Sequence, residues 1–99
     1  MVQINWTFQA KDDLKNIASY ISFDSKQYVK LQILKIKNLT KLLKSHIRIG
    51  KVVPEFGNIN IKELVTRNYR IIYRIVSEDQ IDILVIHHLA RDLHNRNIH

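Results

Sequence analysis

The sequence contains no cysteine, one proline and two glycines among its 99 residues. Without cysteine the chain can form neither disulfides nor thiolate metal sites, so an apolar core alone must hold it together, as is usual for intracellular proteins. No apolar run approaches the roughly 20 residues of a membrane-spanning helix, and the N-terminal segment lacks the pattern of a signal peptide. We therefore expect a cytoplasmic protein that contacts no membrane.

Acidic residues are also scarce. Nine Asp and Glu stand against 16 Lys and Arg, which gives a formal charge of +7. The excess is concentrated in residues 26–74, where twelve basic and two acidic residues give +10, while the rest of the chain sums to −3. Such a segment attracts a polyanion or an acidic protein.

The length predicts a single domain spanning residues 1–99.

The N-terminal half predicts a strand followed by two helices. Apolar and polar residues alternate from Val2 to Phe8, the period of a half-buried strand. From about Gln9 the apolar spacing becomes helical, and Asp12 and Asp13 are placed to favour the positive end of that helix. A second helix gathers apolar side chains on one arc, at Tyr28, Leu31, Leu39, Leu42 and Leu43. A stripe of lysines lies opposite, at Lys26, Lys30, Lys37, Lys41 and Lys44, and is more often a solvated face than a binding surface.

The C-terminal half predicts an antiparallel meander. The three backbone breakers share one loop, at Gly50, Pro54 and Gly57. Three β-rich segments follow with short turns between them, at Ile59–Thr66, Tyr69–Val76 and Gln80–His87. We therefore expect an α+β fold in the order strand, helix, helix, strand, strand, strand. A helix pair on one face would leave the other face of the sheet partly free for a site.

Alternation along the middle strand places Arg70 and Arg74 on one face and the tyrosines on the other. Arginine is an unusual core residue in a strand, and its planar fork suits phosphate or carboxylate. The alternative is that both arginines pair across the sheet with Glu63 or Asp82.

His87 and His88 end the last strand and point to opposite faces. Together with Glu55 in the loop and the strand arginines, His88 completes the residue types that metal-free RNA cleavage needs: a base, an acid and cations for the phosphorane charge. The five histidines have no metal-ligand spacing, and no glycine-rich phosphate loop is present, so we expect no metal and no cofactor.

The order and spacing of several segments resemble the RelE/ParE toxins of bacterial type II toxin–antitoxin modules. The resemblance runs almost end to end. It is carried by Trp6 before the first helix, then by Val53-Pro54-Glu55, Ile61–Val65, Tyr69–Ile75 and Ile83–Leu93. It implies the strand, helical hairpin and antiparallel sheet inferred above, and a growth-inhibiting toxin that a cognate antitoxin neutralises.

The resemblance also implies one of two targets. The RelE and YoeB-like branch cleaves mRNA on the ribosome, and by that likeness Glu55 would be the base, Arg70 the phosphate clamp and His88 the acid. Lys51, Lys62, Arg74 and Arg91 would then hold RNA. We take this endoribonuclease as the first hypothesis. The ParE branch poisons DNA gyrase without catalysis, and the helical hairpin and the stretch from His88 to Leu93 resemble it at least as closely.

Overall fold

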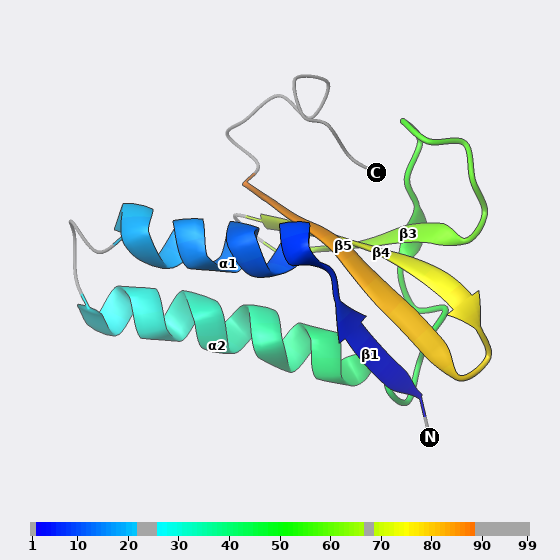
Figure 1. Ribbon diagram of the computed structural model, residues 1–99, viewed down its shortest axis with the longest axis horizontal. Coiled ribbons are helices and arrows are strands. Elements are labelled where there is room, and N and C mark those ends of the chain that lie inside the picture. The colour runs from blue at the N-terminus through cyan, green and yellow to red at the C-terminus, as the bar shows by residue number, and fades with distance from the viewer. Residues whose placement is uncertain (1, 22–25, 67–68, 89–99) are drawn as a thin grey trace.

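The computed structural model describes residues 2–21, 26–66 and 69–88, which form two helices packed on one face of a five-stranded sheet (Figure 1). The elements are β1 (Gln3–Trp6), α1 (Phe8–Ile21), α2 (Lys26–Leu42), β2 (Lys51–Val52), β3 (Ile61–Val65), β4 (Tyr69–Ser77) and β5 (Gln80–His88). Figure 1 shows α1 and α2 side by side and antiparallel. The predicted α+β fold is confirmed.

The sheet has the order β1-β5-β4-β3-β2. The predicted antiparallel meander is formed by β3, β4 and β5, whereas β1 pairs in parallel with β5. The edge strand β2 falls within the predicted breaker region and pairs with β3. Its two residues are too few to show a period-two pattern, so this strand could not be predicted from alternation.

The N-terminus of α1 differs from the expectation. The helix begins at Phe8, and the Oγ1 of Thr7 accepts a hydrogen bond of 3.2 Å from the amide of Ala10, as an N-cap residue does. Asp12 and Asp13 therefore lie beyond the first turn, where they add little to the helix dipole. Asp13 is buried instead, and its carboxylate accepts a hydrogen bond from the amide of Ile86 in β5.

The buried side of α2 is rotated from the predicted arc. Its buried residues are Gln32, Ile36 and Thr40, followed by Leu43 just after the helix. Most of the predicted apolar arc faces outward, with exposed side chains at Tyr28, Leu31 and Leu42. The side that meets the sheet and α1 is set by the packing partners, which helical periodicity alone does not contain. No helix in the described ranges is both long and apolar enough to cross a membrane.

Each face of the sheet has its own apolar cluster. Tyr69, Ile71, Tyr73 and Ile75 of β4 face the helices, as the alternation predicts. On the opposite face, residues of β4 and β5 pack against the loop after β2, in a cluster of Val53, Ile72, Leu84 and Val85 with Phe56 and Ile61 at its margin. The breaker loop thus covers part of the face that we expected to be partly free.

Candidate functional site

The face of the sheet that points away from the helices holds an arginine between two carboxylates. Arg70 of β4 donates from Nη1 and Nη2 to the two carboxylate oxygens of Glu55, at 2.7 and 3.2 Å. It also donates from Nε to Oε2 of Glu63 at 2.7 Å, and its Nη2 contacts the same oxygen. Glu63 lies on the neighbouring strand β3, and Glu55 comes from the loop that covers this face. The structure therefore brings Glu55 and Arg70 together.

This cluster is partly buried and carries a net negative charge. The side chains of Arg70, Glu55 and Glu63 are 14%, 23% and 13% exposed, and one guanidinium between two carboxylates gives −1. The hydrogen bonds to Glu55 raise the pKa of Arg70 above its ordinary value, with a further contribution from Glu63, against the opposing effect of burial. All three nitrogens of Arg70 are engaged. A phosphate would have to displace a carboxylate before Arg70 could bind it.

Arg74 lies on the same face of β4, four residues after Arg70, and is also paired with a carboxylate. Its Nη2 donates to Oδ2 of Asp82 at 3.3 Å, and Asn5 and Gln80 both donate to the other oxygen of that carboxylate at 3.2 Å. The side chain of Arg74 remains 49% exposed. Both arginines therefore pair across the sheet, which is the alternative that the sequence left open.

A β-bulge in β5 decides which histidine shares the face of Arg70. Ile83 faces the helices, and simple alternation from it would place His88 beside Arg70. The observed register pairs Ile72 with Val85 but Tyr73 with Ile83, so Leu84 is an extra residue in β5. Beyond this bulge the alternation is reversed.

As a result, Arg70 pairs in register with His87, and Tyr69 with His88. His87 is 1% exposed. His88 is half-buried on the helix side, where its ring meets that of Tyr69 edge to face at 5.1 Å between centroids. Glu55 and Arg70 thus lie on one face of the sheet and His88 on the other. The three side chains do not converge, and their roles as base, clamp and acid stay predictions.

Sequence reasoning missed His87 as the histidine on the face of Arg70. The signal was hidden because the strand is apolar at nearly every position from Ile81 to Ile86, so its pattern does not mark where an extra residue enters.

The predicted RNA-binding residues are dispersed. Lys51 of β2 is exposed and opposite Glu63, whereas Lys62 is opposite Tyr73 and so lies on the helix side. Arg91 lies outside the described residues. Within residues 2–21, 26–66 and 69–88, no group of three or more His, Asp or Glu side chains could hold a metal ion.

Comparison with known proteins places the chain in a family. Residues 4–93 match the family described as the ParE toxin of the type II toxin–antitoxin system parDE. The fold is similar to a solved chain of the chromosomal ParDE toxin–antitoxin system from P. aeruginosa, with a TM-score of 0.72 and 22% identity, over 89% of this chain and 96% of that one. A search of curated proteins found no significant match.

The family match covers most of the chain and agrees with the resemblance carried by the sequence motifs. A toxin of such a module implies an antitoxin partner. The chain belongs to the ParE toxins of type II toxin–antitoxin systems, within the RelE/ParE superfamily.

Proposed function

We propose that this chain is a growth-inhibiting toxin that binds DNA gyrase and acts without cleaving RNA. The observation that carries the proposal is the separation of the expected catalytic groups: the sheet lies between Glu55 and Arg70 on one side and His88 on the other. Metal-free RNA cleavage needs a base and an acid within hydrogen-bond reach of the same phosphate. Membership of the ParE family, whose branch the resemblance links to gyrase, supports the same target.

The state of Arg70 adds a second argument. A phosphate clamp works through free guanidinium donors, and those of Arg70 are held by two carboxylates in a cluster of net charge −1. The two carboxylates also oppose a phosphate that comes close to Arg70. In this structure Arg70 instead fastens the loop of Glu55 onto β4 and β3.

The two targets are separated by assaying the purified toxin on both. We expect inhibition of gyrase supercoiling with accumulation of gyrase–DNA cleavage complexes, and intact mRNA on translating ribosomes. Cleaved ribosomal mRNA with unaffected gyrase would overturn the proposal and establish the endoribonuclease, the first hypothesis from the sequence.

Variants sharpen the result. His88→Ala and Glu55→Gln should keep growth inhibition if no RNA chemistry depends on them, whereas the endoribonuclease hypothesis expects at least about a hundredfold loss of cleavage for each. Arg48→Ala is a matched control, because it removes an exposed ion pair with Glu78 that no hypothesis uses. Circular dichroism of each variant checks that the fold is kept. Loss of toxicity in folded His88→Ala and Glu55→Gln, but not in Arg48→Ala, contradicts the proposal.

A further inference from the structure

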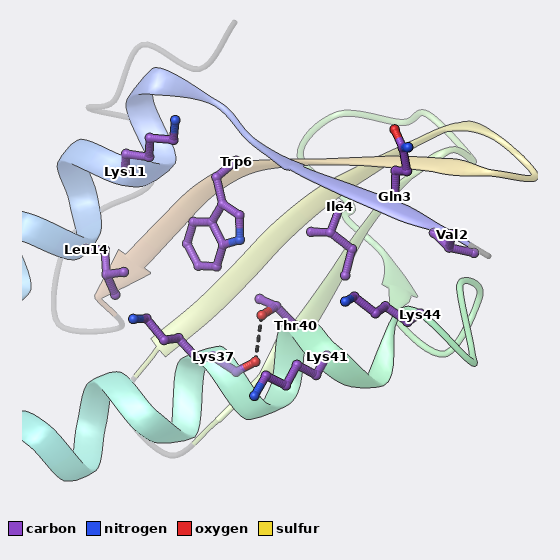
Figure 2. Close-up of a pocket in the computed structure, with 10 residues that line it drawn as sticks. All are labelled: Val2, Gln3, Ile4, Trp6, Lys11, Leu14, Lys37, Thr40, Lys41 and Lys44. Carbon is purple, nitrogen blue, oxygen red and sulfur yellow. Dashed lines mark hydrogen bonds between the residues drawn. The ribbon is translucent and has the colours of Figure 1, made fainter.

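A cavity of about 770 Å³ opens between β1, the start of α1 and the C-terminal half of α2. Figure 2 shows Trp6 and Ile4 projecting from β1 toward α2. Together with Val2 and Leu14 these half-buried side chains give the cavity an apolar lining. The volume falls in the range of ligand-binding cavities, and half-buried apolar side chains gain free energy when a partner covers them.

Four lysines and no acidic residue line the same cavity. Lys37 and Lys41 lie four residues apart on one side of α2, and Lys44 follows in the turn just after that helix. Lys11 comes from α1 (Figure 2). All four are exposed, and none of them forms an ion pair with another residue of the described ranges.

Lysines beside an apolar cavity distinguish this surface from an ordinary solvated lysine face. Unpaired lysines are unremarkable on a convex helix surface, but here they border a concave apolar lining. A single-stranded nucleic acid would favour a basic groove with several aromatic rings on which its bases stack. The cavity has a single aromatic ring, that of Trp6, among aliphatic side chains. An acidic peptide with bulky apolar side chains matches both the charge and the lining.

We propose that this cavity is the docking site for an acidic, amphipathic segment of the antitoxin. Its apolar side chains rest on Trp6 and Ile4, and its carboxylates meet Lys37, Lys41 and Lys44. Carboxylates three or four residues apart on a helix would match the lysine spacing. The proposal rests on membership of a toxin–antitoxin family and not on gyrase as the target.

Two double variants test the cavity against the lysine stripe as a whole. Lys37→Gln with Lys41→Gln changes two residues that line the cavity, and Lys26→Gln with Lys30→Gln changes two exposed lysines of the same helix that do not. Each pair lowers the formal charge from +7 to +5. The probe is the cognate antitoxin, titrated calorimetrically.

We expect the cavity pair to raise the Kd about tenfold or more and the control pair less than about twofold. Equal weakening by both pairs would show a general charge effect, and no weakening by the cavity pair would show an unused cavity. Either result overturns the proposal. All four positions are exposed, so folding should be kept, and thermal melting of both variants verifies this.

Trp6 supplies an independent readout because it is the only tryptophan of the chain. With an antitoxin whose own tryptophans are replaced by Phe, we expect binding to shift the emission to the blue and to protect Trp6 from acrylamide quenching. A short DNA duplex should leave the emission unchanged. Unchanged emission with bound antitoxin, or a duplex that shifts it and competes with the antitoxin, contradicts the proposal.

The gyrase assay without antitoxin separates this proposal from the proposed function. A chain that leaves gyrase active but loses antitoxin affinity in the cavity variant refutes the gyrase target and supports the docking site. If the chain inhibits gyrase but the cavity variant binds the antitoxin as tightly as the wild type, the gyrase target is supported and the docking site is refuted.

Discussion

Gly50 and Tyr73 are in direct contact where the segment after α2 enters the sheet. The fully buried hydroxyl of Tyr73 accepts a hydrogen bond of 2.9 Å from the amide of Gly50 and donates one of 3.0 Å to the carbonyl of Ile47. A Cβ at Gly50 would lie 2.6 Å from Tyr73 Oη and 2.7 Å from the carbonyl oxygen of Glu63. Glycine is therefore required here by close approach.

We expect Gly50→Ala to lower the free energy of unfolding by about 1–3 kcal/mol, because the methyl group must displace a buried ring or a strand backbone. Gly57→Ala is the comparison: its φ of 58° strains any other residue, but no atom lies within 4 Å of the added Cβ. That strain costs about 1 kcal/mol. Urea denaturation measures both. A smaller effect at Gly50 than at Gly57 would contradict the contact argument.

The buried tyrosines predict an alkaline limit to stability. Burial raises the pKa of Tyr73 above 10.0, against a smaller lowering by the Gly50 amide, and burial likewise raises that of Tyr69. A group whose pKa is raised by folding stabilises the native state fully below its unfolded pKa, and this contribution is lost as pH rises through the folded pKa. We expect the urea midpoint to fall above about pH 10.

Tyr73→Phe removes one such group, so the decline with pH should be shallower than in the wild type, although stability at neutral pH is lower. Tyr28→Phe, at an exposed position, is the comparison and should change the slope less, because burial raises the pKa of Tyr69 more than the neighbouring Tyr28 does. Tyrosinate absorbance during an alkaline titration follows ionisation directly. Equal slopes for the wild type and Tyr73→Phe would refute this explanation.

At the scale of elements, α1 and β5 are joined at the point where β5 is irregular. The amide of Ile86, two residues after the extra residue Leu84, donates a 3.0 Å hydrogen bond to Asp13 Oδ2. Gln9 donates to the other oxygen of this carboxylate at 2.9 Å. A buried amide must find an acceptor, and here a helix side chain supplies it.

Asp13→Ala should therefore lower the free energy of unfolding by about 1–3 kcal/mol, the usual cost of leaving a buried donor unpaired. Asp13→Asn retains an acceptor and should cost less. Asp12→Ala, at an exposed position one residue earlier, should change stability by less than about 0.5 kcal/mol. Hydrogen exchange at the Ile86 amide provides a local readout. Unchanged protection of that amide in Asp13→Ala would contradict the assignment.

Across the whole molecule, the described cations fall into two groups. Arg48, Arg70 and Arg74 are each paired with carboxylates. The lysines form no ion pair with another described residue, and the four that line the cavity, Lys11, Lys37, Lys41 and Lys44, place unpaired positive charge around it.

A partner bound there should be sensitive to salt. Raising the ionic strength from about 0.1 to 1 M shortens the Debye length from roughly 10 to 3 Å, so we expect the Kd for the antitoxin to rise about tenfold. The Lys37→Gln and Lys41→Gln double variant should show a smaller salt dependence than the wild type. Calorimetric titrations at several salt concentrations measure this. A Kd that does not change with salt in either protein would contradict the role of the lysines and show that apolar contacts supply the affinity.

Periodicity and composition by themselves determined the α+β class, the order of the predicted elements, the antiparallel meander and the side of β4 that carries Arg70 and Arg74. These properties are local: alternation fixes which residues share a face, and backbone breakers mark where elements end. The motifs also pointed to the superfamily.

Only the tertiary structure decided which face His88 occupies, which side of α2 is buried and where the lysines gather. A bulge depends on how two strands pair, and one extra residue, Leu84, reverses every later position of β5. The roll of α2 depends on the sheet and α1 that it packs against, which bury Ile36 and bring Lys37, Lys41 and Lys44 to the cavity beside β1. Both are set by contacts between segments distant in sequence, and a pattern read along a single segment does not contain them.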